Sequence, residues 1–144
     1  MLANLFGKPT QQNYEVLNNE VAKMKPYEVP PPPQFVFNAM TGVRPHQCFK
    51  AAQAFIKSNL YAPLPMVYVY CFWSEIPFID HAFVLINEQT VYDGVLNKFY
   101  YKDDYYREMQ IVEIRRKTPP QVIKEHANSF DISQDDWTAR LKHM

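Results

Sequence analysis

Three residues of this 144-residue chain have the types that together carry out acyl-transfer chemistry: Cys48, His81 and Asp93. A cysteine thiolate attacks a carbonyl carbon, an imidazole accepts and returns the proton, and a carboxylate orients that imidazole. Cys48 follows Pro45 at the predicted start of a helix, where free backbone N–H groups and the helix dipole lower a thiol pKa. The same N–H groups can stabilise an oxyanion.

Two adjacent strands are expected to position the other two members. His81 opens one predicted strand, Asp93 lies on the next, and residues 87–89 form a hairpin turn between them. This register places residue 81 near residue 95 of the neighbouring strand. Residues 81 and 93 share the parity of residue 95, so both side chains can project from one face. We therefore expect Asp93 to orient the imidazole of His81.

The remaining pattern predicts an α+β domain. Spacing of apolar residues predicts helices at 11–25, 45–60, 119–129 and 133–143, and strands at 66–73, 80–87, 90–96 and 108–116. Ser133 is the expected N-cap of the last helix. The aromatic and charged segment 98–107 matches neither pattern, and its aromatic side chains are expected in the core or in a groove wall. Helices and strands that segregate along the chain are typical of α+β folds.

We expect one domain over residues 1–144. Its parts would be an N-terminal helix and Pro-rich connector at 1–33, a catalytic-like core at 45–116, and C-terminal helices at 118–144. The tract 26–33 contains four consecutive prolines, which favour polyproline II and cannot join a central strand. A stiff connector is the first interpretation of this tract, and a ligand for an SH3 or WW module is the second.

Composition limits the class of partner and the compartment. Lys+Arg and Asp+Glu both number 15, so the formal net charge is zero and gives no sign of a nucleic acid or membrane partner. The N-terminus lacks the pattern of a signal peptide, and no 18-residue apolar stretch occurs. Two cysteines do not make a disulfide framework, which favours a reducing cytoplasm. No Gly-rich phosphate loop is present, and we expect no cofactor.

Three short motifs resemble transglutaminase-like proteins of the papain/transglutaminase superfamily. The segment His46-Gln47-Cys48-Phe49 is similar to the Gly-Gln-Cys-Trp segment at the nucleophile of transglutaminases. Asp80-His81-Ala82-Phe83-Val84 resembles the His-Ala-Trp-Val strand, and Val91-Tyr92-Asp93 resembles the strand with the triad aspartate. The resemblance covers residues 46–95. It implies a nucleophile helix packed on a mostly antiparallel sheet of three to five strands, with Cys48 as nucleophile, His81 as base and Asp93 as orienting acid.

The chain departs from that family at the oxyanion site. The family has a tryptophan upstream of the nucleophile, but no tryptophan precedes Cys48 here. Trp73, or the N–H groups near Cys48, would have to replace it. Gln47, beside the nucleophile, and Trp73 are therefore the candidates for oxyanion or substrate contacts. Arylamine N-acetyltransferases share the order Cys, His, Asp, but their Arg-Gly-Gly-x-Cys segment is absent.

Each residue also has a structural interpretation. A cysteine is commonly a small buried hydrophobe, which we expect of Cys71 inside its apolar strand. Asp93-Gly94 is a turn dipeptide. His46 and Cys48 lie about 200° apart around a helix, so they do not form a metal pair, and no metal is expected.

Two function classes follow. The first is a cysteine hydrolase or acyltransferase acting on an amide bond of a protein or peptide: a peptidase (thiol protease), amidase, deamidase or transglutaminase. The second is a non-catalytic protein-binding module, an inhibitor or adaptor, on the same fold. Cys48 sealed under side chains, more than about 4 Å from His81, would favour the second class.

Overall fold

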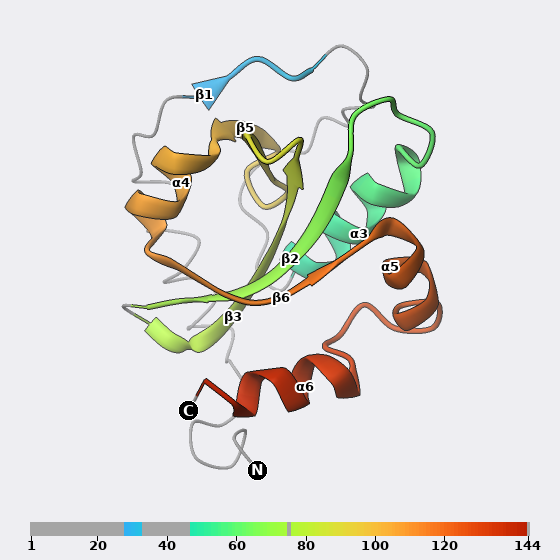
Figure 1. The fold of residues 1–144 in the computed structure, drawn as a ribbon, viewed down its shortest axis with the longest axis vertical. Helices are drawn as coiled ribbons and strands as arrows, with labels where there is room; N and C mark the ends of the chain where they lie inside the picture. The colour runs from blue at the N-terminus through green and yellow to red at the C-terminus, as the bar shows by residue number, and fades with distance from the viewer. Residues whose placement is uncertain (1–27, 33–46, 75, 144) are drawn as a thin grey trace.

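A six-stranded antiparallel sheet forms the centre of the computed structural model, which describes residues 28–32, 47–74 and 76–143 (Figure 1). The strands are β1 (Glu28–Val29), β2 (Met66–Trp73), β3 (Ile76–Ile86), β4 (Thr90–Asp93), β5 (Lys98–Tyr101) and β6 (Ile111–Lys117). Their order across the sheet is β1-β5-β4-β3-β2-β6. The described helices are α3 (Cys48–Ser58), α4 (Lys102–Met109), α5 (Pro119–Glu125) and α6 (Gln134–Leu141).

The α+β class is confirmed, but the expected strand number of three to five is wrong. Six strands pair because the unassigned segment 98–107 supplies β5 and most of α4, and because Glu28–Val29 pairs with β5. β1 lies inside the 26–33 tract, immediately before Pro30, and it occupies the edge of the sheet, where neighbouring prolines are tolerated. The predicted helix at 11–25 and the start of the proline tract lie outside the described residues.

The predicted central strand and hairpin are present. β2 lies between β3 and β6, which fits its almost wholly apolar sequence. β3 and β4 pair with Val84 opposite Tyr92, the register that the sequence predicts. Asn87 and Glu88 in the connecting turn both have positive φ, as tight hairpin turns with right-handed twist require.

Helix ends differ from the predictions in ways that local chemistry explains. α4 extends to Met109 and ends where Gln110 adopts a left-handed conformation, so the last strand begins at Ile111 and not at residue 108. Ser133 caps α6 as predicted, in a capping box with Asp136. Pro45, the predicted start of the second helix, lies outside the described residues, and α3 begins at Cys48.

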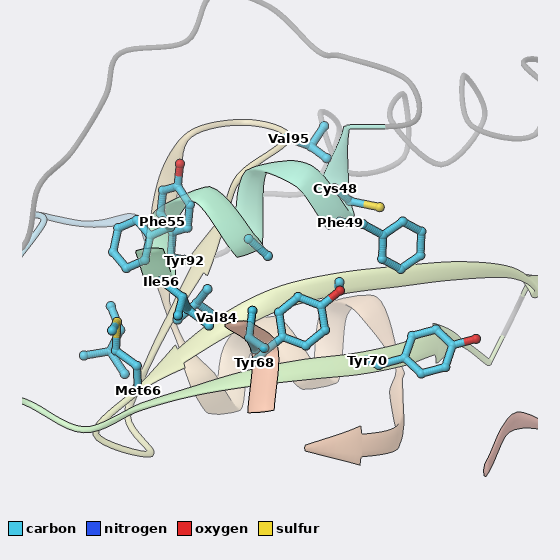
Figure 2. Packing of buried hydrophobic residues seen from close by; sticks show 14 of the residues in the cluster. Cys48, Phe49, Phe55, Ile56, Met66, Tyr68, Tyr70, Val84, Tyr92 and Val95 are labelled. Carbon is cyan, nitrogen blue, oxygen red and sulfur yellow. The ribbon is translucent and has the colours of Figure 1, made fainter. Parts of the chain in front are cut away.

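Helices cover both faces of the sheet (Figure 1). On one face, α3 and α5 pack on side chains that include Tyr68, Ala82 and Val84. On the opposite face, Tyr105 and Met109 of α4 pack on a second cluster that includes Phe83. Successive residues of β3 therefore enter different cores, because strand side chains alternate between faces. Figure 2 shows the α3-side core, where Phe55 of α3 stacks on Tyr92 of β4 with ring centroids 4.1 Å apart.

The first turn of α3 lies directly against the backbone at the end of β4. A Cβ atom at Gly94 would lie 2.4 Å from Cβ of Ala51, closer than real side chains approach. The Asp-Gly pair therefore allows a close helix–strand approach in addition to forming a turn. This contact brings the first turn of α3, which begins at Cys48, against the residue that follows Asp93.

We expect Gly94→Ala to destabilise the fold by about 1–3 kcal/mol, because Ala51 belongs to a packed helix and cannot move aside freely. Ala51→Gly alone should cost about 1 kcal/mol of helix propensity. The double variant should lose less than the sum of the two, since removing Cβ of Ala51 makes the space that the new methyl group at position 94 needs. Urea unfolding of the four proteins measures this coupling, and strictly additive losses would show that the contact is not tight.

Candidate active site

Cys48 is the first residue of α3, and two backbone N–H groups donate to its sulfur. Gln47 precedes the helix without a side-chain cap, which leaves the N–H groups of the first turn available. The sulfur accepts hydrogen bonds from the N–H of Phe49 in its own helix and from the N–H of Ala82 on β3. Both bonds favour the thiolate and lower the pKa of Cys48.

The bond from Ala82 places the thiol beside the backbone that carries His81. β4 pairs with β3 only from Val84 onward, so no β4 residue lies beside Ala82 to take its N–H. Strand N–H groups point within the sheet, so the sulfur lies close to the level of the sheet. The thiol therefore contacts the peptide unit that joins His81 to Ala82.

Burial dominates the electrostatics of this thiol. Cys48 is 2% exposed, and burial raises its pKa to about 12 despite the N–H of Ala82, with Asp93 raising it further. Burial also lowers the pKa of His81 below its ordinary value, against the opposing effect of Asp93. Both groups are therefore neutral at pH 7, as thiol and imidazole and not as an ion pair.

His81 and Asp93 come together through a third residue, Tyr105 of α4. Nε2 of His81 lies 2.9 Å from the Tyr105 hydroxyl, which donates to Oδ2 of Asp93 at 2.7 Å. Nε2 of His81 and Oδ2 of Asp93 are 3.9 Å apart. Oδ1 of Asp93 accepts the N–H groups of Val95 and Leu96 at 2.9 and 3.3 Å. The side chains of His81 and Asp93 share one face of the sheet, as their parity predicts. The hydroxyl of Tyr105 lies between them.

The structure does not join Cys48 to His81 by a hydrogen bond. Cys48 belongs to the α3-side core, whereas His81 contacts Phe83 and Tyr105 on the α4 side. Within the described residues, Nδ1 of His81 is buried and has no hydrogen-bond partner. The thiol of Cys48 and the imidazole of His81 thus lie on opposite sides of the same stretch of β3. Nδ1 of His81 makes no hydrogen bond within the described residues.

The two other predicted site residues lie apart from each other. Gln47 is half-buried beside Cys48, and its backbone carbonyl accepts the N–H of Ala51 at 2.8 Å. Trp73 is buried in the α4-side cluster, so the sheet separates its indole from the α3 side. Trp73 therefore does not replace the missing upstream tryptophan in this arrangement. Cys71 is fully buried in the same cluster, which confirms its assignment to the core.

Asp80 also acts on the thiol of Cys48 and is paired with Arg140, and no sequence pattern pointed to this pair. Asp80 precedes His81 and is buried, and its Oδ1 lies 3.1 Å from Nε of Arg140 in α6. The guanidinium of Arg140 also lies over the ring of Phe72, 4.4 Å from its centroid. Burial raises the pKa of Asp80 to about 6, outweighing the lowering by Arg140 and by Tyr70. Nothing in the sequence relates residues 80 and 140, because only the folded chain brings α6 to β3.

Comparison with known proteins gives no match: no protein-family model, no curated protein and no solved structure matches the chain. Across the described residues, no group of three or more His, Cys, Asp or Glu side chains is arranged to hold a metal ion. Over the same residues, no helix has the length and apolar character needed to span a membrane.

Asp80 should make the stability of the protein depend on pH in a defined direction. Its folded pKa of about 6 exceeds the ordinary value of 3.8, so the folded state binds more protons between these two values. The contribution of Asp80 to stability is therefore lost as pH rises through this window. Compared with Asp80→Asn, the wild type should lose about 2 kcal/mol of unfolding free energy between about pH 4 and pH 7.

Urea unfolding of both proteins across this range measures the difference. Asp131→Asn, which changes an exposed carboxylate, is the control and should show little pH-dependent difference from the wild type. A wild-type-to-Asp80→Asn difference that stays constant with pH would contradict the prediction.

Proposed function

We propose that this chain is a cysteine-dependent hydrolase or acyltransferase of the papain/transglutaminase-like kind, acting on an amide bond of a protein or peptide. Cys48 is the nucleophile, His81 the base and Asp93 the acid that orients the base through Tyr105. The observation that carries the proposal is the hydrogen bonding of the two ring nitrogens of His81. Its Nε2 is held toward Asp93, its Nδ1 is unused among the described residues, and the thiol of Cys48 contacts the adjoining peptide unit.

The reaction follows from these positions. Sγ of Cys48 attacks the amide carbonyl carbon while Nδ1 of His81 takes the thiol proton. The imidazolium then gives that proton to the leaving amine as the C–N bond breaks, which leaves a thioester on Cys48. Water or an amine attacks the thioester and restores the thiol. Cys48 and His81 lie in different cores in the structure, so the proposal requires Nδ1 to reach Sγ in the substrate complex past the flank of β3, where β4 no longer pairs.

Neutral reactants suit this general-base route. A thiol whose pKa is about 12 is not a thiolate at neutral pH, so the proton must leave during the attack. A buried imidazole whose pKa is lowered is unprotonated at pH 7 and therefore able to accept that proton. The arrangement also supports a papain/transglutaminase-like fold. The proposed nucleophile begins a helix, and that helix packs on adjacent antiparallel strands that bear the proposed base and acid.

One observation favours the second candidate, a non-catalytic protein-binding module. Cys48 is buried and makes no hydrogen bond to His81 within the described residues. A sealed thiol with a raised pKa is the expected state of a cysteine that only packs. The pH dependence of thiol reactivity separates this module from the enzyme.

We expect Cys48 to react with iodoacetamide at a rate that rises with deprotonation of His81 and is flat above about pH 7, as general-base assistance requires. Cys71→Ala leaves a single thiol for this measurement by intact mass spectrometry. Adding His81→Ala should slow the reaction at neutral pH about 100-fold and make the rate rise about tenfold per pH unit, as for an unassisted thiol.

His126→Gln in the same background is the matched control, since His126 is also buried but bonds Lys117 and not the triad. The flat profile should survive this change. A rate that rises tenfold per pH unit with His81 present would sink the enzyme proposal and leave the module.

A further inference from the structure

Tyr105 occupies a position that packing alone does not explain. Its side chain is fully buried on α4, and its ring contacts Phe83 and Tyr100 with centroids 5.3 and 5.6 Å away. A phenylalanine would make the same ring contacts. The hydroxyl instead lies between His81 and Asp93, with hydrogen bonds of 2.9 and 2.7 Å.

The direction of these bonds follows from the number of hydrogens available. A carboxylate oxygen accepts, and the single O–H of Tyr105 donates to Oδ2 of Asp93. The hydroxyl oxygen can then only accept from His81, so Nε2 of His81 must carry a proton. In a neutral imidazole the other nitrogen is then bare, so Nδ1 carries a lone pair and no proton.

Asp93 is too far away to set this arrangement by itself. The 3.9 Å between Nε2 of His81 and Oδ2 of Asp93 exceeds the length of a hydrogen bond. Neither end is free to close the gap, because Oδ1 of Asp93 is tied to two backbone N–H groups and His81 is part of a paired strand. The influence of the carboxylate on the imidazole therefore passes through the hydroxyl of Tyr105.

We propose that Tyr105 is the positioning residue of the site: its hydroxyl holds His81 as the Nε2–H tautomer and leaves Nδ1 as the proton acceptor. The role of Nδ1 in catalysis rests on the proposed function, whereas the tautomer does not. A member of the unassigned segment 98–107 thereby becomes the link between base and acid. An imidazole with the opposite tautomer would present an N–H to the thiol and could not act as a base.

The tautomer is directly measurable by ¹⁵N NMR of the histidine side chains. The chain has four histidines, and His81→Gln identifies the signal of His81 by its loss. In the wild type at neutral pH we expect this signal to be that of a single Nε2–H tautomer. An Nδ1–H tautomer in the wild type overturns the proposal without any variant of Tyr105.

Tyr105→Phe keeps the ring and removes only the hydroxyl. We expect the His81 signal of this variant to show a mixture of tautomers, and alkylation of Cys48 at neutral pH to slow about tenfold to a hundredfold. Tyr100→Phe is the matched control: it removes a hydroxyl from the same cluster and should change neither quantity.

The two readouts separate the two proposals. An unchanged His81 tautomer in Tyr105→Phe overturns the positioning role, whatever the reactivity of Cys48. A changed tautomer supports that role. If His81→Ala also leaves the pH profile of Cys48 alkylation unchanged, the positioning role stands and the proposed enzymatic function fails.

Discussion

The arrangement of the site depends on one close contact, between the first turn of α3 and the backbone of Gly94. Any side chain at position 94 would overlap Ala51, so the helix rests on the end of β4 only because a glycine is there. That contact brings the start of α3 to the flank of β3 at Ala82, where β4 no longer pairs. The thiol of Cys48 consequently reaches a strand N–H, and Asp93 lies close enough to act on its pKa.

β3 then divides the polar groups between two cores. Asp80 and Cys48 face the α3 side, whereas His81 and Asp93 meet Tyr105 on the α4 side. Burial is the largest influence on the pKa of Cys48, of His81 and of Asp80, and in each case it favours the neutral form. The resting site is therefore held by hydrogen bonds between neutral and singly charged groups, and not by a thiolate–imidazolium pair.

A buried lysine attaches the C-terminal helices to the same sheet. Lys117 at the end of β6 is fully buried and bonds Oδ2 of Asp136 at 2.6 Å and Nε2 of His126 at 2.8 Å. Arg115 joins Asp136 to Glu125, which ties α6 to α5. A buried charge is tolerated only with such partners, so this network specifies where α6 lies. That placement in turn brings Arg140 of α6 to Asp80.

The sequence by itself determined the local elements and the shared face of His81 and Asp93. The apolar run at 66–73, the hairpin turn and the cap at Ser133 are local signals, and a strand period of two follows from backbone geometry alone. It did not reveal the role of Tyr105, because nothing local relates a residue of an aromatic helix to a histidine two strands away. Only the tertiary structure decided that the hydroxyl of Tyr105 joins His81 to Asp93, that Cys48 approaches β3 from the other core, and that burial raises the pKa of its thiol. Each of these depends on how the chain packs and on which groups it removes from water. The spacing of residues along the sequence does not determine that.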